Sequence, residues 1–225
     1  MESNIRLSAA DDHEFGAYVA ECSSPPGVAV VVLQKSSVSI AASRSIADDY
    51  SGQGFSLIAP SLFDRVERDL ELGYGPADVA EGTRVATKLG LDAALKDVEA
   101  ASNYGRLLAR PTVAVLGYCF GGTLAWLSAT RLNPAVAVCY YGGRIFEHAA
   151  EAPRCAVMLH FETRDPHIPA ARIETIQRFH PDLPLFLYNA GHGFNCDQRA
   201  DFQPEAASLA RQRTIEFLHT HLSAR

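Results

Sequence analysis

The chain has 225 residues, of which 48% are hydrophobic and 20% charged, and its formal net charge at pH 7 is −6. The apolar content excludes an intrinsically disordered chain, and 26 acidic against 20 basic side chains argue against a nucleic-acid-binding protein, which normally carries a basic face. No run of about 20 apolar residues occurs, so we expect no membrane-spanning segment. The length suits one substantial core, and we predict a single domain over residues 1–225.

The N-terminal residues and the cysteines both indicate a cytoplasmic protein. The first ten residues include Glu2 and Arg6 and lack the apolar segment of a secretory signal. The five cysteines are an odd number without closely spaced pairs, which is not typical of a disulfide framework. A reducing compartment is therefore the expected location.

Short apolar runs predict buried strands along the chain. The segment 14–20 alternates more than the others, and we expect it to be an outer, antiparallel strand. The later runs are continuously apolar, as in strands that are covered on both faces. In chain order they span residues 28–33, 55–59, 112–116, 135–141, 156–161 and 185–188.

Stretches of helical character separate these strands. Residues 91–104 place their apolar side chains on one helical face, and Pro204 suits the first turn of a C-terminal helix. The expected helices span residues 40–51, 91–104, 120–131, 170–179 and 204–222. Alternating strands and helices predict an α/β fold with a mostly parallel sheet and helices on both faces. Ligands of such sheets bind at the carboxyl ends of the strands.

The turn after the strand 112–116 reads Gly-Tyr-Cys-Phe-Gly-Gly over residues 117–122. It matches the nucleophile elbow G-x-S-x-G, with Cys119 in the position of the serine. Small residues on both sides let the backbones pass at a sharp strand-to-helix turn, and the helix N-terminus favours a thiolate. The alternatives are a buried, inert cysteine and a phosphate-binding loop, which would need a different glycine spacing and a lysine.

An elbow nucleophile requires a base and a carboxylate that orients it, in the chain order nucleophile, acid, histidine. His192 lies between two glycines after the last predicted strand, and Asp165 follows the strand 156–161. Glu162 and Asp182 compete with Asp165 for the role of the acid, and the Asp-Pro sequence at 165 is also an ordinary turn signal. We predict Cys119, Asp165 and His192 as the catalytic residues.

The remaining histidines do not form a pattern that indicates a metal site. His160 lies within an apolar strand and is expected to be a hydrogen-bonded core residue, whereas His167 is either a substrate contact or a surface residue. His219 and His221 are two residues apart, and a helical metal pair would be separated by four. No Cys-x-x-Cys sequence occurs. We therefore expect no metal and no cofactor.

At these motifs the sequence resembles the dienelactone hydrolase family, the carboxymethylenebutenolidases, which are small α/β-hydrolases with a Cys-Asp-His triad. The order of the predicted strands is similar over about residues 14–222. The resemblance is carried by the segments 117–122, 140–142, 165–169 and 190–194.

The resemblance implies an α/β-hydrolase fold and a carboxylic ester hydrolase. Cys119 would attack the carbonyl carbon of a small ester or lactone, His192 would transfer protons, and Asp165 would orient His192. The backbone N–H groups of Phe120 and Ser36 would form the oxyanion hole.

The resemblance also implies a substrate pocket, with Tyr140 and Arg84 among its residues. Lys35 stands where the family commonly has a glutamate, and an ammonium group there would favour a thiolate on the nucleophile. Ser37 replaces a phenylalanine, and Cys196 stands where some members have an arginine. These differences affect the expected substrate more than the fold or the triad.

Three functions therefore remain open: a cysteine hydrolase of a small lactone or ester, a broad carboxylesterase or thioesterase, and a catalytically silent α/β-hydrolase that binds a small ligand. The intact triad favours an enzyme. We expect a small-molecule partner, no nucleic acid and no membrane, and a monomer or weak homo-oligomer.

Overall fold

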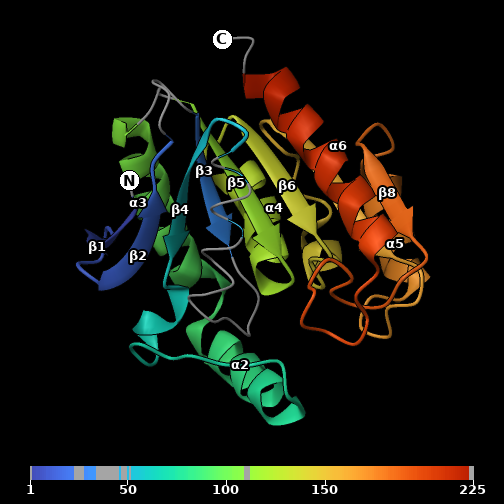
Figure 1. Cartoon of the computed structure of the whole chain (residues 1–225). Coiled ribbons are helices and arrows are strands. Elements are labelled where there is room, and N and C mark those ends of the chain that lie inside the picture. The colour runs from blue at the N-terminus through green and yellow to red at the C-terminus, as the bar shows by residue number, and fades with distance from the viewer. Residues whose placement is uncertain are drawn as a thin grey trace. The chain divides into compact units, whose positions relative to one another are not determined.

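The computed structural model describes residues 2–22, 28–33, 46, 50, 52–108 and 112–222. The chain forms two compact units, residues 1–115 and 116–225, whose boundary lies within strand β5 (Val113–Tyr118). The strand order of the eight-stranded sheet is β1-β2-β4-β3-β5-β6-β7-β8 (Figure 1). This mostly parallel sheet with its helices is the predicted α/β-hydrolase fold. The expectation of a single domain stays a prediction.

The first unit contains strands β1 to β4. β1 pairs with β2, and β2 with β4, in antiparallel register, whereas β3 and β4 are parallel. The antiparallel strand expected over residues 14–20 is therefore confirmed, but its outer position is wrong, because β1 forms the edge. The sequence did not reveal β1, because most of its residues are exposed and polar. The bounds are β1 Glu2–Ser8, β2 Glu14–Ala20, β3 Val28–Leu33 and β4 Phe55–Pro60.

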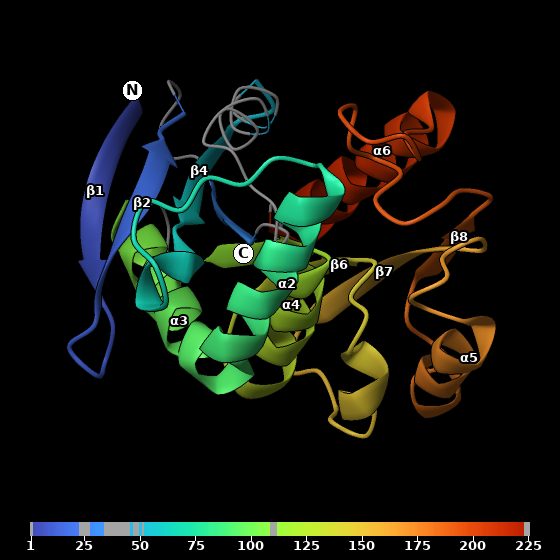
Figure 2. The same cartoon turned by 90° about the horizontal axis from the view of Figure 1, so that it is seen from below.

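The helices of the first unit are a 3-10 turn at Leu62–Arg65, α2 (Pro76–Leu89) and α3 (Leu91–Leu108). α3 packs on β3 and β4 along one face of their sheet (Figure 2). Gly105 permits this packing, because a Cβ atom there would lie 3.1 Å from the Cβ of Ala29. α2 was not predicted, since no side chain caps its N-terminus and it buries only three residues.

The second unit contains three parallel strands, and the observed bounds agree with the prediction within one residue. Both α4 and α6 contact β6 and β7, from opposite faces (Figures 1 and 2). Parallel strands end at the same edge of a sheet, so the loops after β6, β7 and β8 converge. The bounds are α4 Phe120–Arg131, β6 Val136–Tyr140, a 3-10 turn Ile145–His148, β7 Ala156–Glu162, α5 Ala170–Phe179, β8 Leu185–Tyr188 and α6 Pro204–Leu222.

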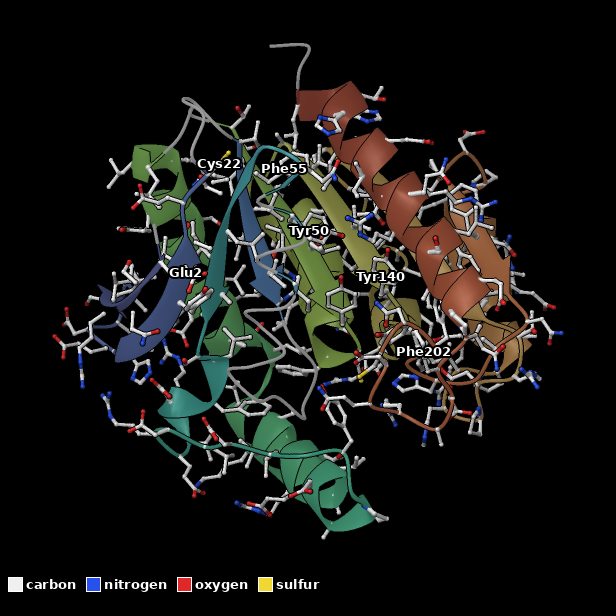
Figure 3. All side chains as sticks on the ribbon, in the orientation of Figure 1. Glu2, Cys22, Tyr50, Phe55, Tyr140 and Phe202 are labelled. Carbon is white, nitrogen blue, oxygen red and sulfur yellow. The ribbon has the colours of Figure 1, made fainter. Side chains whose placement is uncertain are left out.

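A buried polar network joins α6 to the strands of the second unit. His160 is fully buried, with Nδ1 2.8 Å from the Tyr188 hydroxyl and Nε2 3.2 Å from Thr214 Oγ1. The hydroxyl of Tyr140, labelled in Figure 3, lies 2.6 Å from the same Oγ1 atom. Burial lowers the pKa of His160 to about 3, so the imidazole is neutral. The prediction of a hydrogen-bonded core histidine is confirmed.

Two expectations remain, a helix over residues 40–51 and the absence of a membrane-spanning segment. The first lies mostly outside the described residues. For the second, none of the helices that the structure describes has the length and apolar character that a membrane span requires.

Candidate active site

Cys119 lies at the apex of the turn between β5 and α4. Its backbone has φ 54° and ψ −112°, a conformation that non-glycine residues rarely adopt. A Cβ atom on Gly117 would overlap the carbonyl group of Gly121, and one on Gly122 would overlap the carbonyl oxygen of Tyr140. The Cys119 N–H donates to that same carbonyl oxygen at 2.9 Å. Gly117 is therefore a steric requirement of this elbow, as its sequence pattern predicts, and Gly122 is a second one that the pattern does not include.

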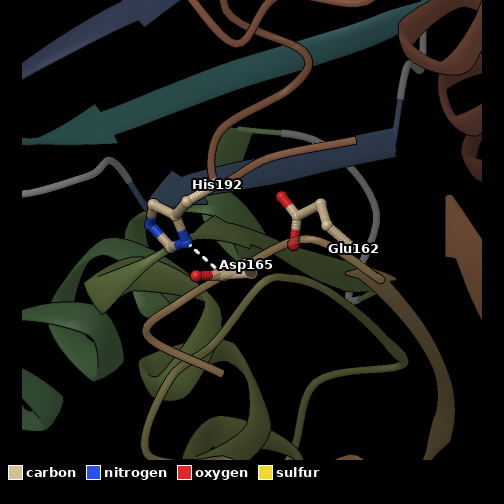
Figure 4. Close-up of side chains that lie close together, drawn as sticks. All are labelled: Glu162, Asp165 and His192. Atoms are coloured by element: carbon tan, nitrogen blue, oxygen red, sulfur yellow. Dashed lines mark hydrogen bonds and ion pairs between the residues drawn. The ribbon is translucent and has the colours of Figure 1, made fainter. Parts of the chain in front are cut away.

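The structure brings the three predicted catalytic side chains together. His192 Nδ1 donates to Asp165 Oδ2 at 2.6 Å (Figure 4), and His192 Nε2 lies 3.3 Å from Cys119 Sγ. The Asp165 side chain is fully buried, that of His192 is 12% exposed, and Cys119 is half-buried. The order thiol, imidazole, carboxylate is the geometry of a nucleophile, its base and the group that orients the base.

The electrostatics of this chain of groups favour a carboxylate and an imidazolium. Burial opposes ionisation of Asp165, but the hydrogen bond and charge of His192 outweigh it and lower the pKa of Asp165. Burial likewise opposes the charge of His192, yet its hydrogen bonds to Asp165 and Cys119 raise its pKa to about 10. A proton on His192 is the form that pairs best with a thiolate on Cys119.

Hydrogen bonds fasten the loop that carries Asp165 to the loop that carries His192. The N–H groups of Thr163 and Arg164 donate to the carbonyl oxygens of Tyr188 and Ala190 at 2.9 and 3.1 Å. The second oxygen of Asp165 accepts the N–H of His167 at 2.7 Å. Both carboxylate oxygens are therefore engaged, and the side chain has one orientation.

Two aromatic rings flank the imidazole of His192. The Tyr141 ring lies edge-on with its centroid 5.0 Å away, and the His167 ring lies 5.5 Å away. The Tyr141 hydroxyl donates to Asn195 Oδ1, and its backbone has φ +38°. Sequence reasoning missed Tyr141 and singled out its neighbour Tyr140, because a Tyr-Tyr pair at a strand end does not reveal which ring turns toward the histidine.

Glu162 is a second acid beside the triad. It competed with Asp165 in the sequence, and the hydrogen bond from His192 assigns that partnership to Asp165. Glu162 is 1% exposed, and its Oε1 atom accepts the N–H of Gly193 at 3.1 Å. Burial, helped by the charge of Asp165, raises the pKa of Glu162 to about 8 against the opposing effects of His192 and Gly193.

Glu162, Asp165 and His192 also form a group that could geometrically hold a metal ion, since one ligand atom from each lies within 4.8 Å of the others. In this group His192 Nδ1 donates to Asp165, and both Asp165 oxygens accept hydrogen bonds. The protein itself therefore satisfies most of the atoms that a metal would require. We interpret the group as a hydrogen-bonded triad with an added acid, and the absence of a metal stays a prediction.

The predicted oxyanion-hole and pocket residues have not all been placed. Phe120 is the first residue of α4, directly after the nucleophile, and its role stays a prediction. Lys35 and Ser36 lie outside the described residues. Tyr140 is 2% exposed, and its role as a pocket residue stays a prediction.

Arg84 lies on α2 in the first unit. Its guanidinium donates to Glu81 at 2.8 and 2.5 Å, and its side chain is 54% exposed. The guanidinium that would bind a substrate carboxylate is thus paired with Glu81. The pocket role of Arg84 stays a prediction.

All five cysteines belong to the described residues, and all are free thiols. Cys139 and Cys196 are buried, whereas Cys119 is half-buried, as a nucleophile requires. Burial raises the pKa of Cys155 to about 11 and that of Cys139 well above its usual value, so neither thiol is activated.

Comparison with known proteins identifies the family of the chain. A model of the dienelactone hydrolase family matches residues 15–222. The carboxymethylenebutenolidase of Pseudomonas putida is 28% identical over 230 residues, covering 97% of this chain and 96% of the relative. Carboxymethylenebutenolidase 1 of Cupriavidus pinatubonensis is 26% identical over 227 residues, covering 97% of each. The crystal structure of a provisionally assigned dienelactone hydrolase from Klebsiella pneumoniae superposes with a TM-score of 0.82 at 22% identity, covering 96% of this chain and 98% of that one.

Proposed function

Because the chain belongs to the dienelactone hydrolase family, we propose that it is a hydrolase that cleaves a small ester or lactone with Cys119 as nucleophile. One observation carries the proposal: the imidazole of His192 bridges Cys119 Sγ at 3.3 Å and Asp165 Oδ2 at 2.6 Å. The curated relatives are carboxymethylenebutenolidases, which supports a lactone or ester as substrate.

In the proposed reaction the Cys119 thiolate attacks the carbonyl carbon, and the C–S bond forms as the carbonyl electrons move onto oxygen. Backbone N–H groups, with that of Phe120 proposed as one donor, would stabilise the oxyanion. When the tetrahedral intermediate collapses, the C–O bond breaks and the His192 imidazolium protonates the departing alkoxide. The products of this half-reaction are a thioester on Cys119 and a free hydroxyl group.

Water then completes the reaction. His192, now neutral, removes a proton from water as the oxygen attacks the thioester carbonyl, and collapse of the second intermediate expels the thiolate. Asp165 remains ionised throughout and stabilises the imidazolium, which is present before the first half-reaction and forms again in the second. The lowered pKa of Asp165 is consistent with this role.

Hydrolysis of p-nitrophenyl esters and of dienelactone by the wild type, Cys119→Ala and Cys155→Ala tests the proposal. We expect Cys119→Ala to lose at least about 10³-fold in kcat/KM, and Cys155→Ala, which removes a different half-buried thiol, to stay within about twofold of the wild type. Mass spectrometry of the quenched reaction should find the acyl group on Cys119. Unchanged turnover in Cys119→Ala would refute the nucleophile.

The substrate panel also separates the alternatives. Turnover of many simple esters without a preference for dienelactone would favour a broad carboxylesterase. Absence of turnover by the wild type would favour a ligand-binding protein. The cytoplasmic location and the oligomeric state stay predictions.

A further inference from the structure

The triad leaves one buried acidic side chain unexplained. Glu162 ends β7, its exposed fraction is 1%, and its Oε2 atom is buried without a hydrogen-bond partner among the described residues. A buried carboxyl oxygen without a partner costs free energy, more so when it is charged. A triad needs one carboxylate, and Asp165 already supplies it, so Glu162 requires a role of its own.

The position of Glu162 relates it to His192 in two ways. Its Oε1 atom accepts the N–H of Gly193, the residue that follows the histidine in the chain. Gly193 has φ +81°, so the loop adopts at this point a backbone conformation that few side chains permit. Glu162 therefore holds the glycine turn that directly follows His192.

The second relation is electrostatic. Ligand-type atoms of Glu162, Asp165 and His192 all lie within 4.8 Å of one another (Figure 4). The titratable groups that face Glu162 are Asp165 on the loop after β7, His192 on the loop after β8 and Tyr141 after β6. Two carboxylates at this separation repel each other, so one of them keeps its proton more tightly. Asp165 has the imidazolium as a hydrogen-bond partner, so the proton remains on Glu162.

We propose that Glu162 is a positioning residue that holds the His192 loop through Gly193, and that its buried, unpartnered carboxyl group supplies a second negative charge to the His192 imidazolium when it ionises. This proposal rests on the triad of the proposed function. At neutral pH Asp165 is the single carboxylate that faces His192. Once Glu162 ionises, two carboxylates face the imidazolium, and His192 loses its proton at a higher pH than it otherwise would.

Glu162 can act on the imidazolium because it ionises at a lower pH than the one at which His192 loses its proton. The pKa of Glu162 is raised to about 8, mainly by burial, and that of His192 to about 10, against its burial, by Asp165 and Cys119. Glu162 therefore ionises while His192 is still protonated. Its new charge then acts on the imidazolium over the remaining alkaline range.

NMR titration of the imidazole nitrogens tests whether the charge of Glu162 acts on His192, and it requires no substrate. The samples are ¹⁵N-histidine-labelled wild type, Glu162→Gln and, as a matched control, Glu174→Gln, which removes an exposed acid of α5. Glutamine keeps an oxygen for the Gly193 N–H but cannot ionise. We expect the proton affinity of His192 to fall by about tenfold or more in Glu162→Gln and to be unchanged in Glu174→Gln. Coincident His192 titrations in the wild type and Glu162→Gln would overturn the proposal.

A measurement on the wild type alone covers the case in which Glu162→Gln does not fold. With ¹³C-labelled glutamate side chains, one carboxyl carbon should titrate near pH 8, far above the others. If every glutamate has titrated by pH 6, Glu162 is not the neutral acid that the proposal requires.

Ester hydrolysis at pH 6.5 tests whether Glu162 positions the His192 loop through Gly193. We expect Glu162→Gln to retain kcat within about threefold of the wild type, because the acceptor for Gly193 remains, and Glu162→Leu to lose more than about tenfold at unchanged circular dichroism. Equal kcat values for the two variants would overturn the positioning role. If the wild type hydrolyses no ester, the proposed function fails, and the NMR titration still decides whether Glu162 acts on His192.

Discussion

The Nε2 atom of His192 lies 3.3 Å from the Sγ atom of Cys119, although 73 residues separate the two in the chain. The strand ends bring the two residues together, because Cys119 follows β5 and His192 follows β8. Each side chain is then held by its own backbone constraint, the strained elbow for the thiol and the glycine-flanked loop for the imidazole.

Replacing Asp165 with asparagine should lower kcat by about 10³- to 10⁴-fold with little change in KM. The amide cannot stabilise the imidazolium, and its NH₂ group can turn toward His192 Nδ1 and favour the wrong tautomer. Asp182→Asn, an exposed acid of the same unit, serves as the control and should keep wild-type kcat. Equal kcat in Asp165→Asn and Asp182→Asn would rule out the orienting role.

Replacing Gly117 with alanine should destabilise the protein by more than about 2 kcal/mol and reduce ester hydrolysis, because the added Cβ overlaps the carbonyl group of Gly121. Gly143→Ala is the matched control, since its Cβ would meet Ile168 only at an ordinary contact distance of 3.9 Å. Urea unfolding should place Gly143→Ala within about 0.5 kcal/mol of the wild type. Similar stabilities for the two variants would contradict the steric account of the elbow.

Thr214→Val should reduce the free energy of unfolding by about 1–3 kcal/mol, because it leaves the Tyr140 hydroxyl and His160 Nε2 without their shared partner. The control is Thr220→Val, on the exposed face of the same helix, whose hydroxyl donates to the backbone oxygen of Glu216. Chemical denaturation of both variants measures the difference. Loss of the same amount from each would mean that helix propensity, rather than the buried network, is responsible.

The stability of the protein should fall as the pH rises from about 4.5 to 8, by an amount that Glu162→Gln removes. Burial raises the pKa of Glu162 to about 8 from its ordinary value of 4.5, which means that the folded protein binds this proton more tightly than the unfolded chain. The resulting stabilisation is complete below pH 4.5 and is lost as the pH approaches 8, on the order of a few kcal/mol.

His192 contributes a separate loss of stability between about pH 6.5 and 10, because its pKa is also raised in the folded protein. Between pH 5 and 8 His192 is protonated in both folded proteins, so the difference between the unfolding free energies of the wild type and Glu162→Gln in this range isolates Glu162. A difference that does not vary between pH 5 and 8 would show that Glu162 has an ordinary pKa in the folded protein.

Sequence reasoning recovered the parallel strands well because each carries a continuous apolar run with a glycine or polar turn after it. It missed β1, whose residues are mostly exposed, and α2, which begins at Pro76 after Gly75, an N-cap residue without a capping side chain. β1 pairs with β2 and α2 contacts the 3-10 turn at Leu62–Arg65, and no local pattern of their own residues marks either element.

The proposed nucleophile and the order of the proposed triad could be predicted from the sequence, because the glycines around Cys119 and His192 meet steric requirements that arise within a few adjacent residues. Three features required the folded structure: Asp165 is the acid that accepts the hydrogen bond from His192, the Tyr141 ring lies against the imidazole, and Glu162 is buried beside it. These are distances between side chains on separate loops, and they depend on where the strands of the sheet end rather than on the spacing of residues along the chain.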